Sequence, residues 1–109
     1  MQFTEGKDLY LSCSVTSGSY STITLSKVNI DSVEVMAVFN SDGTTKVMTA
    51  RNSSTERHQN LGLTLMALTL VKAGCEDIGI YRCSHDNGQM SEGRVEISSK
   101  FYVGQSFKT

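Results

Sequence analysis

The sequence predicts an all-β fold in which two sheets pack face to face as a sandwich. Valine, isoleucine, leucine and tyrosine recur in alternating runs, the pattern of half-buried strands. Turn signals rich in glycine, aspartate and asparagine separate these runs at intervals of about ten residues. Two cysteines, Cys13 and Cys83, each lie in such a run. With 109 residues, 39% of them hydrophobic and 19% charged, the chain has the length and composition of one folded domain.

The first half of the chain contains a short edge strand and four further predicted strands. Leu9, Leu11, Cys13 and Val15 alternate with polar residues and form one buried strand face. An Asp-Gly pair in Ser41–Thr44 predicts a hairpin turn. The predicted strands are Met1–Glu5, Leu9–Val15, Thr22–Asn29, Val33–Asn40 and Thr45–Arg51. In the fourth of these, alternation places Val33, Val35, Ala37 and Phe39 on one face, and Glu34, Met36 and Val38 on the other.

The second half is expected to begin with a loop at Asn52–Asn60, because that stretch is polar and has no periodicity. Leu61–Val71 is rich in leucine, and its alternation changes phase near Leu65-Met66, which we interpret as a strand with a β-bulge. A helix is the alternative, since leucines there also fit a helical face.

Two more strands are predicted, joined through the hairpin signal Asp86-Asn87-Gly88. They span Gly79–His85 and Arg94–Val103. We therefore expect the domain to cover residues 1–103 and residues 104–109 to form a C-terminal tail or linker.

The most specific motif is Asp77-Ile78-Gly79-Ile80-Tyr81-Arg82-Cys83, in which Tyr81 and Cys83 face the same side of a strand. With Leu9-x-Leu11-x-Cys13 and Leu68-x-Leu70-x-x-Ala73, it resembles the immunoglobulin superfamily over most of the chain. The resemblance implies a Greek-key sandwich in which a Cys13–Cys83 disulfide joins the sheets and Tyr81 forms the tyrosine corner. It also implies structural roles for Gly79, in the turn, and for Asp77, paired with Arg57 or, as second choice, with Arg51.

Leu25 marks a departure from this family. Immunoglobulin domains usually carry a tryptophan at this place, packed on the disulfide. Neighbouring leucines or Phe39 must fill the space that leucine leaves, or a cavity remains. The extra strand at Val33–Asn40 favours a variable-type or intermediate domain. In its overall character the chain resembles the immunoglobulin domains of molluscan fibrinogen-related immune lectins and, less closely, those of cnidarian allorecognition receptors.

Several function classes are disfavoured. The net charge is −1 and no cluster of lysine and arginine occurs, so we expect no nucleic-acid partner. No apolar run approaches the length of a membrane span, and Met1–Glu5 does not have the pattern of a signal peptide. His58 and His85 lack the spacing of metal ligands, and the chain has neither a nucleophile elbow nor a phosphate-binding loop. We therefore expect neither an enzyme nor a metal or cofactor.

Two residues indicate contacts outside the fold. Cys75 is left over if Cys13 and Cys83 pair. It is then either a free, partly buried thiol or a link to a cysteine outside the chain, including that of a second copy in a dimer. Asn52-Ser53-Ser54 is an N-glycosylation sequon, which we expect in a loop of a secreted glycoprotein.

Two surfaces are candidates for binding a partner. One is the outer face of the sheet that immunoglobulin domains build from strands G, F, C and C′, where we expect Met36, Val38, Ile80 and Arg82 to contact the partner. The residues predicted on this face are Thr24, Ser26, Val28, Met36, Val38, Ile80, Arg82, Arg94, Glu96, Ser98 and Lys100. The other surface is the loops at one end of the sandwich, with His85, Asp86 and Asn87 at the tip.

These surfaces favour an extracellular recognition or adhesion module of an innate-immune or cell-surface protein. Its partner is a protein or a glycan, with a second copy of the chain among the candidates. The alternative is a structural spacer domain in a multidomain protein whose other domains bind the ligand.

Overall fold

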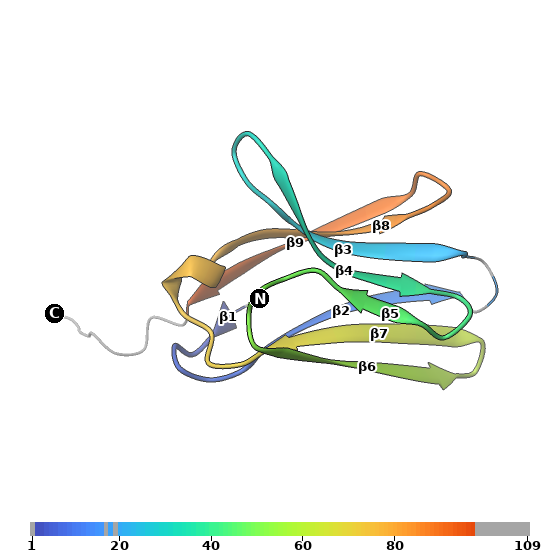
Figure 1. Cartoon of the computed structure of the whole chain (residues 1–109), viewed down its shortest axis with the longest axis horizontal. Helices are drawn as coiled ribbons and strands as arrows, with labels where there is room; N and C mark the ends of the chain where they lie inside the picture. Colours follow the sequence, from blue (N-terminus) through green and yellow to red (C-terminus); the bar gives the residue numbers. More distant parts are fainter. Residues whose placement is uncertain (1, 17, 19, 98–109) are drawn as a thin grey trace, which may run out of the picture.

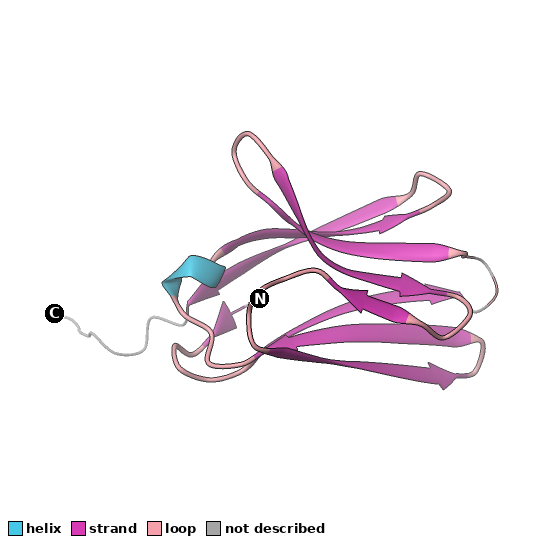
Figure 2. Ribbon diagram, viewed as in Figure 1, coloured by secondary structure: helices cyan, strands magenta, loops and turns pink. Residues whose placement is uncertain are grey.

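The computed structural model describes residues 2–16, 18 and 20–97, which form nine strands and one turn of 3-10 helix (Figure 1). The helix, η1, is Cys75–Asp77. The strands are β1 (Gln2–Phe3), β2 (Leu9–Thr16), β3 (Thr22–Val28), β4 (Val33–Asn40), β5 (Thr45–Val47), β6 (Ser53–Asn60), β7 (Leu63–Leu70), β8 (Gly79–His85) and β9 (Met90–Ile97). Among the described residues, every remaining segment is a loop or turn (Figure 2).

The strands form two sheets that pack face to face (Figure 2). The larger sheet has the order β1-β9-β8-β3-β4-β5, and the smaller has the order β2-β7-β6. Every neighbouring pair is antiparallel except β1 and β9, which run parallel. This is the strand order of a variable-type immunoglobulin domain, with β9, β8, β3 and β4 in the places of G, F, C and C′. The predicted all-β, immunoglobulin-like sandwich is therefore confirmed.

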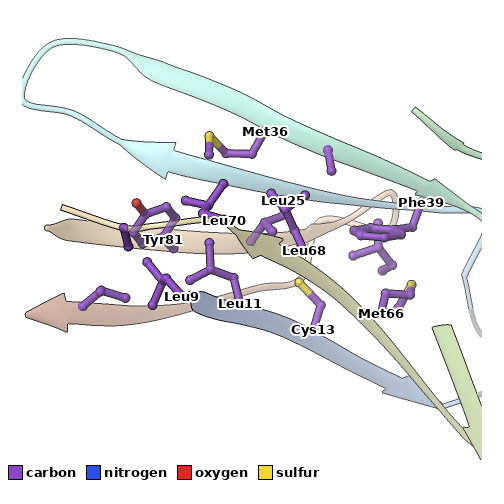
Figure 3. Close-up of a cluster of buried hydrophobic side chains, with 14 of the residues drawn as sticks. Leu9, Leu11, Cys13, Leu25, Met36, Phe39, Met66, Leu68, Leu70 and Tyr81 are labelled. Atoms are coloured by element: carbon purple, nitrogen blue, oxygen red, sulfur yellow. The ribbon is translucent and has the colours of Figure 1, made fainter. Parts of the chain in front are cut away.

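Inward-facing side chains of both sheets make one core (Figure 3). Along β2, every odd-numbered residue from Leu9 to Val15 is buried and every even-numbered one is exposed. Leu25 is also buried, and it is the register partner of Cys83 on the neighbouring strand. It belongs to the same buried core as Phe39 and Leu68.

The Cys13–Cys83 disulfide links β2 to β8 and so joins the two sheets. The two Cα atoms lie 5.9 Å apart, and 70 positions separate the cysteines in the sequence. Closing a loop of this length stabilises the fold by roughly 4 kcal/mol in the chain-entropy model. The predicted pairing is confirmed.

The prediction of a loop at Asn52–Asn60 is wrong, because Ser53–Asn60 forms β6. All eight of its residues pair in register with β7, from Ser53 opposite Leu70 to Asn60 opposite Leu63. The strand lies at the edge of the smaller sheet, and its side chains are exposed apart from the half-buried Ser53 and Arg57. Such an edge strand needs no apolar face, so periodicity could not reveal it.

The predicted β-bulge at Leu65-Met66 is also absent, because β7 pairs without interruption with β2 and β6. The inward row of β7 consists of Thr64, Met66, Leu68 and Leu70. The first residue of this inward row is Thr64 and not a leucine. The leucines around it, Leu63 and Leu65, face the other way, so the leucine pattern alone suggested a change of phase. The leucines before it, Leu61 and Leu63, are exposed and belong to the turn and the outer face.

A bulge occurs instead in β4. The register jumps from Leu25 opposite Ala37 to Ser26 opposite Val35, which leaves Met36 as the extra residue. Met36 therefore turns into the core, where only 3% of it is exposed, so its predicted place on the outer face is wrong. Its carbonyl oxygen accepts hydrogen bonds from the backbone N–H groups of Met48 and Thr49 at 2.8 and 3.1 Å.

The predicted end of the domain at residue 103 and the tail at 104–109 lie outside the described residues, as do Ser98 and Lys100. Within the described part, the last strand begins at Met90 and not at Arg94. The return strand after the Asp-Gly hairpin is shorter than predicted, since β5 ends at Val47.

Candidate functional site

The turn before β8 has a structural role. The Tyr81 hydroxyl donates a hydrogen bond of 2.8 Å to the carbonyl oxygen of Asp77, which makes the tyrosine corner. Burial raises the pKa of Tyr81 above its ordinary value. The Asp77 carboxylate accepts a hydrogen bond from the backbone N–H of Gly74 at 2.9 Å and forms an ion pair with Arg51. The hydrogen bond that the Arg51 guanidinium donates to the Asp77 carboxylate raises the pKa of Arg51.

The predicted pairing of Asp77 with Arg57 is therefore wrong, and Arg51 is the partner. The backbone N–H of Val71 bonds to the carbonyl oxygen of Asn52, so the start of β6 lies beside the turn that leads to η1. The two arginines are six positions apart in the sequence, which spans up to roughly 20 Å at the rise of a strand. Arg57 consequently lies too far along the sheet to reach Asp77.

Arg57 holds the β4–β5 hairpin instead. Its guanidinium donates to the carbonyl oxygens of Asn40 and Thr44, both at 2.8 Å, and to the Thr45 hydroxyl at 2.9 Å. It also lies over the ring of Phe39, 5.6 Å from its centre. Arg57 thus ties the edge of the smaller sheet to the larger one.

The outer face of the β9-β8-β3-β4 sheet carries an apolar strip. Register partners lie on the same face of a sheet, so the outward rows follow from the pairing. One row joins Val33, Val28 and Ile80. The bulge at Met36 brings Val33 and Val35 onto this face, although alternation predicted them in the core. The strip consists of Val28, Val33, Val35, Val38 and Ile80, of which Val33 and Val35 are exposed and the others half-buried.

Paired charges border this strip on β8 and β9. Arg82, which is half-buried, forms a 2.7 Å ion pair with Glu92, its register partner. Arg94 forms a second ion pair with Glu96 at 3.0 Å. On β8 and β9, both signs of charge therefore lie beside the apolar strip.

The strip continues onto a projecting hairpin. Figure 1 shows the loop between β3 and β4 standing away from the body of the sandwich. Ile30, in this loop, is completely exposed. The backbone N–H of Asn29 bonds to the carbonyl oxygen of Ser32 at 2.8 Å, which closes the tip. An isoleucine displayed in this way has no packing role within the described residues.

In the end loops, the side chains of Asp86 and Asn87 accept hydrogen bonds from nearby backbone N–H groups. The Asp86 carboxylate accepts hydrogen bonds from the backbone N–H groups of Ser21 and Thr22, which lowers its pKa and ties the β8–β9 hairpin to the start of β3. Asn87 accepts a bond from the N–H of Gln89 at 2.9 Å. His85 is half-buried, and its Nδ1 atom is buried with no hydrogen-bond partner among the described residues.

Cys75 and Asn52 lie at the surface. Cys75 is a free, exposed thiol at the first position of η1, not the partly buried one considered from the sequence. Asn52 is exposed directly before β6, and its sequon runs into an edge strand and not through a loop.

Within the described range no group of three or more histidine, cysteine, aspartate or glutamate side chains is placed to hold a metal ion. The described chain likewise has no helix long and apolar enough to cross a membrane.

The comparisons with known proteins bear on the fold. No family model and no curated protein matches the sequence. One similar solved structure comes from a photo-crosslinking study of the multimeric cell-adhesive interactions of VGSC beta subunits. It has a TM-score of 0.72 and 14% identity, and the match covers 92% of this chain and 91% of that one. In all, 620 chains of solved structures match, so the fold is one that many functions share.

Proposed function

We propose that this domain is a non-catalytic recognition or adhesion module that binds another protein through the outer face of the β9-β8-β3-β4 sheet. The observation that carries the proposal is the apolar strip with the exposed Ile30 beside it. Exposed apolar residues are common singly, but a contiguous strip rimmed by polar residues is typical of an interaction surface. Cross-strand pairing alone explains a half-buried Val28, but it does not explain why Val33 and Ile30 face solvent.

A second copy of the chain is the first partner to test. The strip and its paired charges are self-complementary, as a contact between identical surfaces requires. The structurally similar VGSC beta subunit takes part in multimeric cell-adhesive interactions, which is consistent with this use of the fold. A glycan is less favoured, because the strip offers neither exposed aromatic rings nor unpaired polar groups.

The proposed setting is extracellular, in a secreted protein or on a cell surface. The Cys13–Cys83 disulfide supports this, since such bonds persist in oxidising compartments. The resemblance to molluscan immune lectins or cnidarian receptors stays a prediction, as does glycosylation of Asn52. The domain architecture of the complete protein would separate these two families.

Bead aggregation tests the binding face. Beads coated with the protein should aggregate, and Val33→Glu should abolish aggregation by placing a charge in the strip. Leu63→Glu is the matched control, because Leu63 is 55% exposed and Val33 is 50% exposed, but Leu63 lies on the other sheet. Circular dichroism should show that both variants remain folded.

If the domain is a structural spacer, which is the alternative function, beads coated with the protein should not aggregate. If beads carrying the unaltered protein stay dispersed, the second copy is not the partner. If Leu63→Glu disrupts aggregation and Val33→Glu does not, the binding face is assigned to the wrong sheet.

A further inference from the structure

The exposed Asn52 lies on the outer face of the smaller sheet, directly before β6. Its carbonyl oxygen accepts a hydrogen bond of 2.9 Å from the backbone N–H of Val71, which continues the pairing of β6 with β7 by one residue. Ser53 pairs with Leu70, which is fully buried, so this row faces the core. Because side chains alternate along a strand, the Asn52 side chain points away from the core.

Tyr10 provides an aromatic ring on the same outer face. The even-numbered residues of β2 face outward, and 39% of Tyr10 is exposed. Its register partner on β7 is Thr69, which pairs on its other side with Ser54 of the sequon. Tyr10 therefore lies two strands across and one outward-facing row along from Asn52, which is about 10 Å and about 7 Å at ordinary strand spacings.

The Tyr10 side chain reaches across β7 toward β6. Its hydroxyl hydrogen-bonds to the Glu56 carboxylate, and β7 lies between the two strands that carry these residues. Burial, and then the negative charge of Glu56, raises the pKa of Tyr10. Ala67, the partner of Glu56 on β7, belongs to an outward-facing row but is 1% exposed, so neighbouring side chains cover it. An aromatic side chain thus lies across the smaller sheet and is partly open to solvent.

We propose that Asn52 carries an N-linked glycan whose first N-acetylglucosamine units pack against the Tyr10 ring on the outer face of the smaller sheet. The face of an aromatic ring is partly negative and attracts the C–H groups of a sugar ring. The apolar strip of the larger sheet lies on the opposite side of the sandwich. The glycan therefore covers the sheet that the proposed binding face does not use.

Attachment of the glycan is a group transfer in the secretory pathway, where a lipid pyrophosphate carries the oligosaccharide. A bond forms between the side-chain nitrogen of Asn52 and C1 of the first sugar, the C1–O bond to the pyrophosphate breaks, and the amide gives up one proton. The sequon Asn52-Ser53-Ser54 has the required serine at its third position. Because Ser53 and Ser54 pair with β7 in the folded domain, the transfer has to precede the folding of β6. Such a glycan requires the extracellular setting proposed above but not the binding face.

Mass spectrometry of the protein secreted from mammalian cells tests the attachment. Treatment with an amidase that releases N-linked glycans should remove the mass of one glycan, and Asn52→Gln and Ser54→Ala should each carry none. Secretion of the folded, unaltered protein without a glycan at Asn52 would overturn the proposal.

Thermal unfolding tests the contact with Tyr10. The glycosylated protein should melt about 2–5 °C above the same chain made in bacteria with its disulfide formed. Tyr10→Phe keeps the ring and should keep this difference, whereas Tyr10→Ser should abolish it. Each variant is compared with its own unglycosylated form, so the effect of the substitution on folding cancels. An equal difference in Tyr10→Ser, or no difference in the unaltered chain, would show that the glycan does not pack on the ring.

Nuclear Overhauser contacts between the Tyr10 ring protons and the first sugars give a second measurement, and their absence would contradict the proposed packing. Val33→Glu, on the other sheet, should keep both the glycan and the difference in melting temperature. A failure of the bead assay therefore leaves these measurements unchanged, whereas loss of the melting difference in Val33→Glu would mean that the glycan is assigned to the wrong face.

Discussion

Replacing Arg51 by methionine is expected to destabilise the domain more than the same change at Arg57. The Asp77 side chain is 4% exposed and that of Arg51 is 28% exposed. The change leaves a nearly buried carboxylate with one remaining bond, from the Gly74 N–H. Removing one partner of a buried pair costs about 3–5 kcal/mol, whereas an exposed pair contributes at most about 1 kcal/mol.

Because Arg51 is partly exposed, we expect Arg51→Met to lower the free energy of unfolding by about 3 kcal/mol, near the lower end of the range for buried pairs. This corresponds to a fall in melting temperature of roughly 15 °C for a domain of this size. Arg57→Met should lower the free energy of unfolding by about 1–2 kcal/mol, because the hydrogen bonds from Arg57 to the β4–β5 hairpin are lost.

Urea denaturation of the single variants and of the double variants with Asp77→Asn gives the coupling energies. The cycle should show a coupling of about 2 kcal/mol for Arg51 with Asp77 and none for Arg57 with Asp77. If Arg51→Met costs less than about 1 kcal/mol, or if Arg57 couples to Asp77, the assigned ion pair and the reasoning on its burial are wrong.

Three further outcomes are expected. Since hydrogen bonds from Ser21 and Thr22 lower the pKa of Asp86, their contribution is present above the ordinary value of 3.8 and is lost as pH falls through the lowered value. The protection of the Ser21 and Thr22 amides, measured relative to intrinsic exchange at the same pH, should therefore fall at acid pH, and Asp86→Asn should remove this fall. Leu61 has a φ of 50° and is 94% exposed, so Leu61→Asn should raise stability by about 0.5–1 kcal/mol in urea denaturation, and a loss of stability would show that Leu61 packs on something. Cys75 is exposed, so non-reducing gels should show a dimer that reductant and Cys75→Ser both remove; equal mobility with and without reductant would contradict this.

Local patterns in the sequence were sufficient for the framework of the fold. The alternation of Leu9 to Val15 predicts a core strand because a strand's side chains alternate regardless of its neighbours. The Asp-x-Gly-x-Tyr-x-Cys motif predicts the tyrosine corner and, through the family resemblance, the disulfide, since these depend on a few residues at fixed spacing. Polar β6 gave no such signal, because an exposed edge strand is held by backbone pairing with β7.

The surface was decided by the tertiary structure. One extra residue in β4, visible only in its register against β3, moves Met36 into the core and brings Val33 and Val35 to the outer face. A bulge reverses alternation on one side of it, so the faces assigned to Val33 and Val35 change, while Ala37, Val38 and Phe39 keep theirs. The choice of Arg51 over Arg57 likewise depends on which end of β6 lies beside η1. Local sequence patterns were thus enough to predict an immunoglobulin-like sandwich, whereas the pairing of its strands fixed which residues lie on its surface.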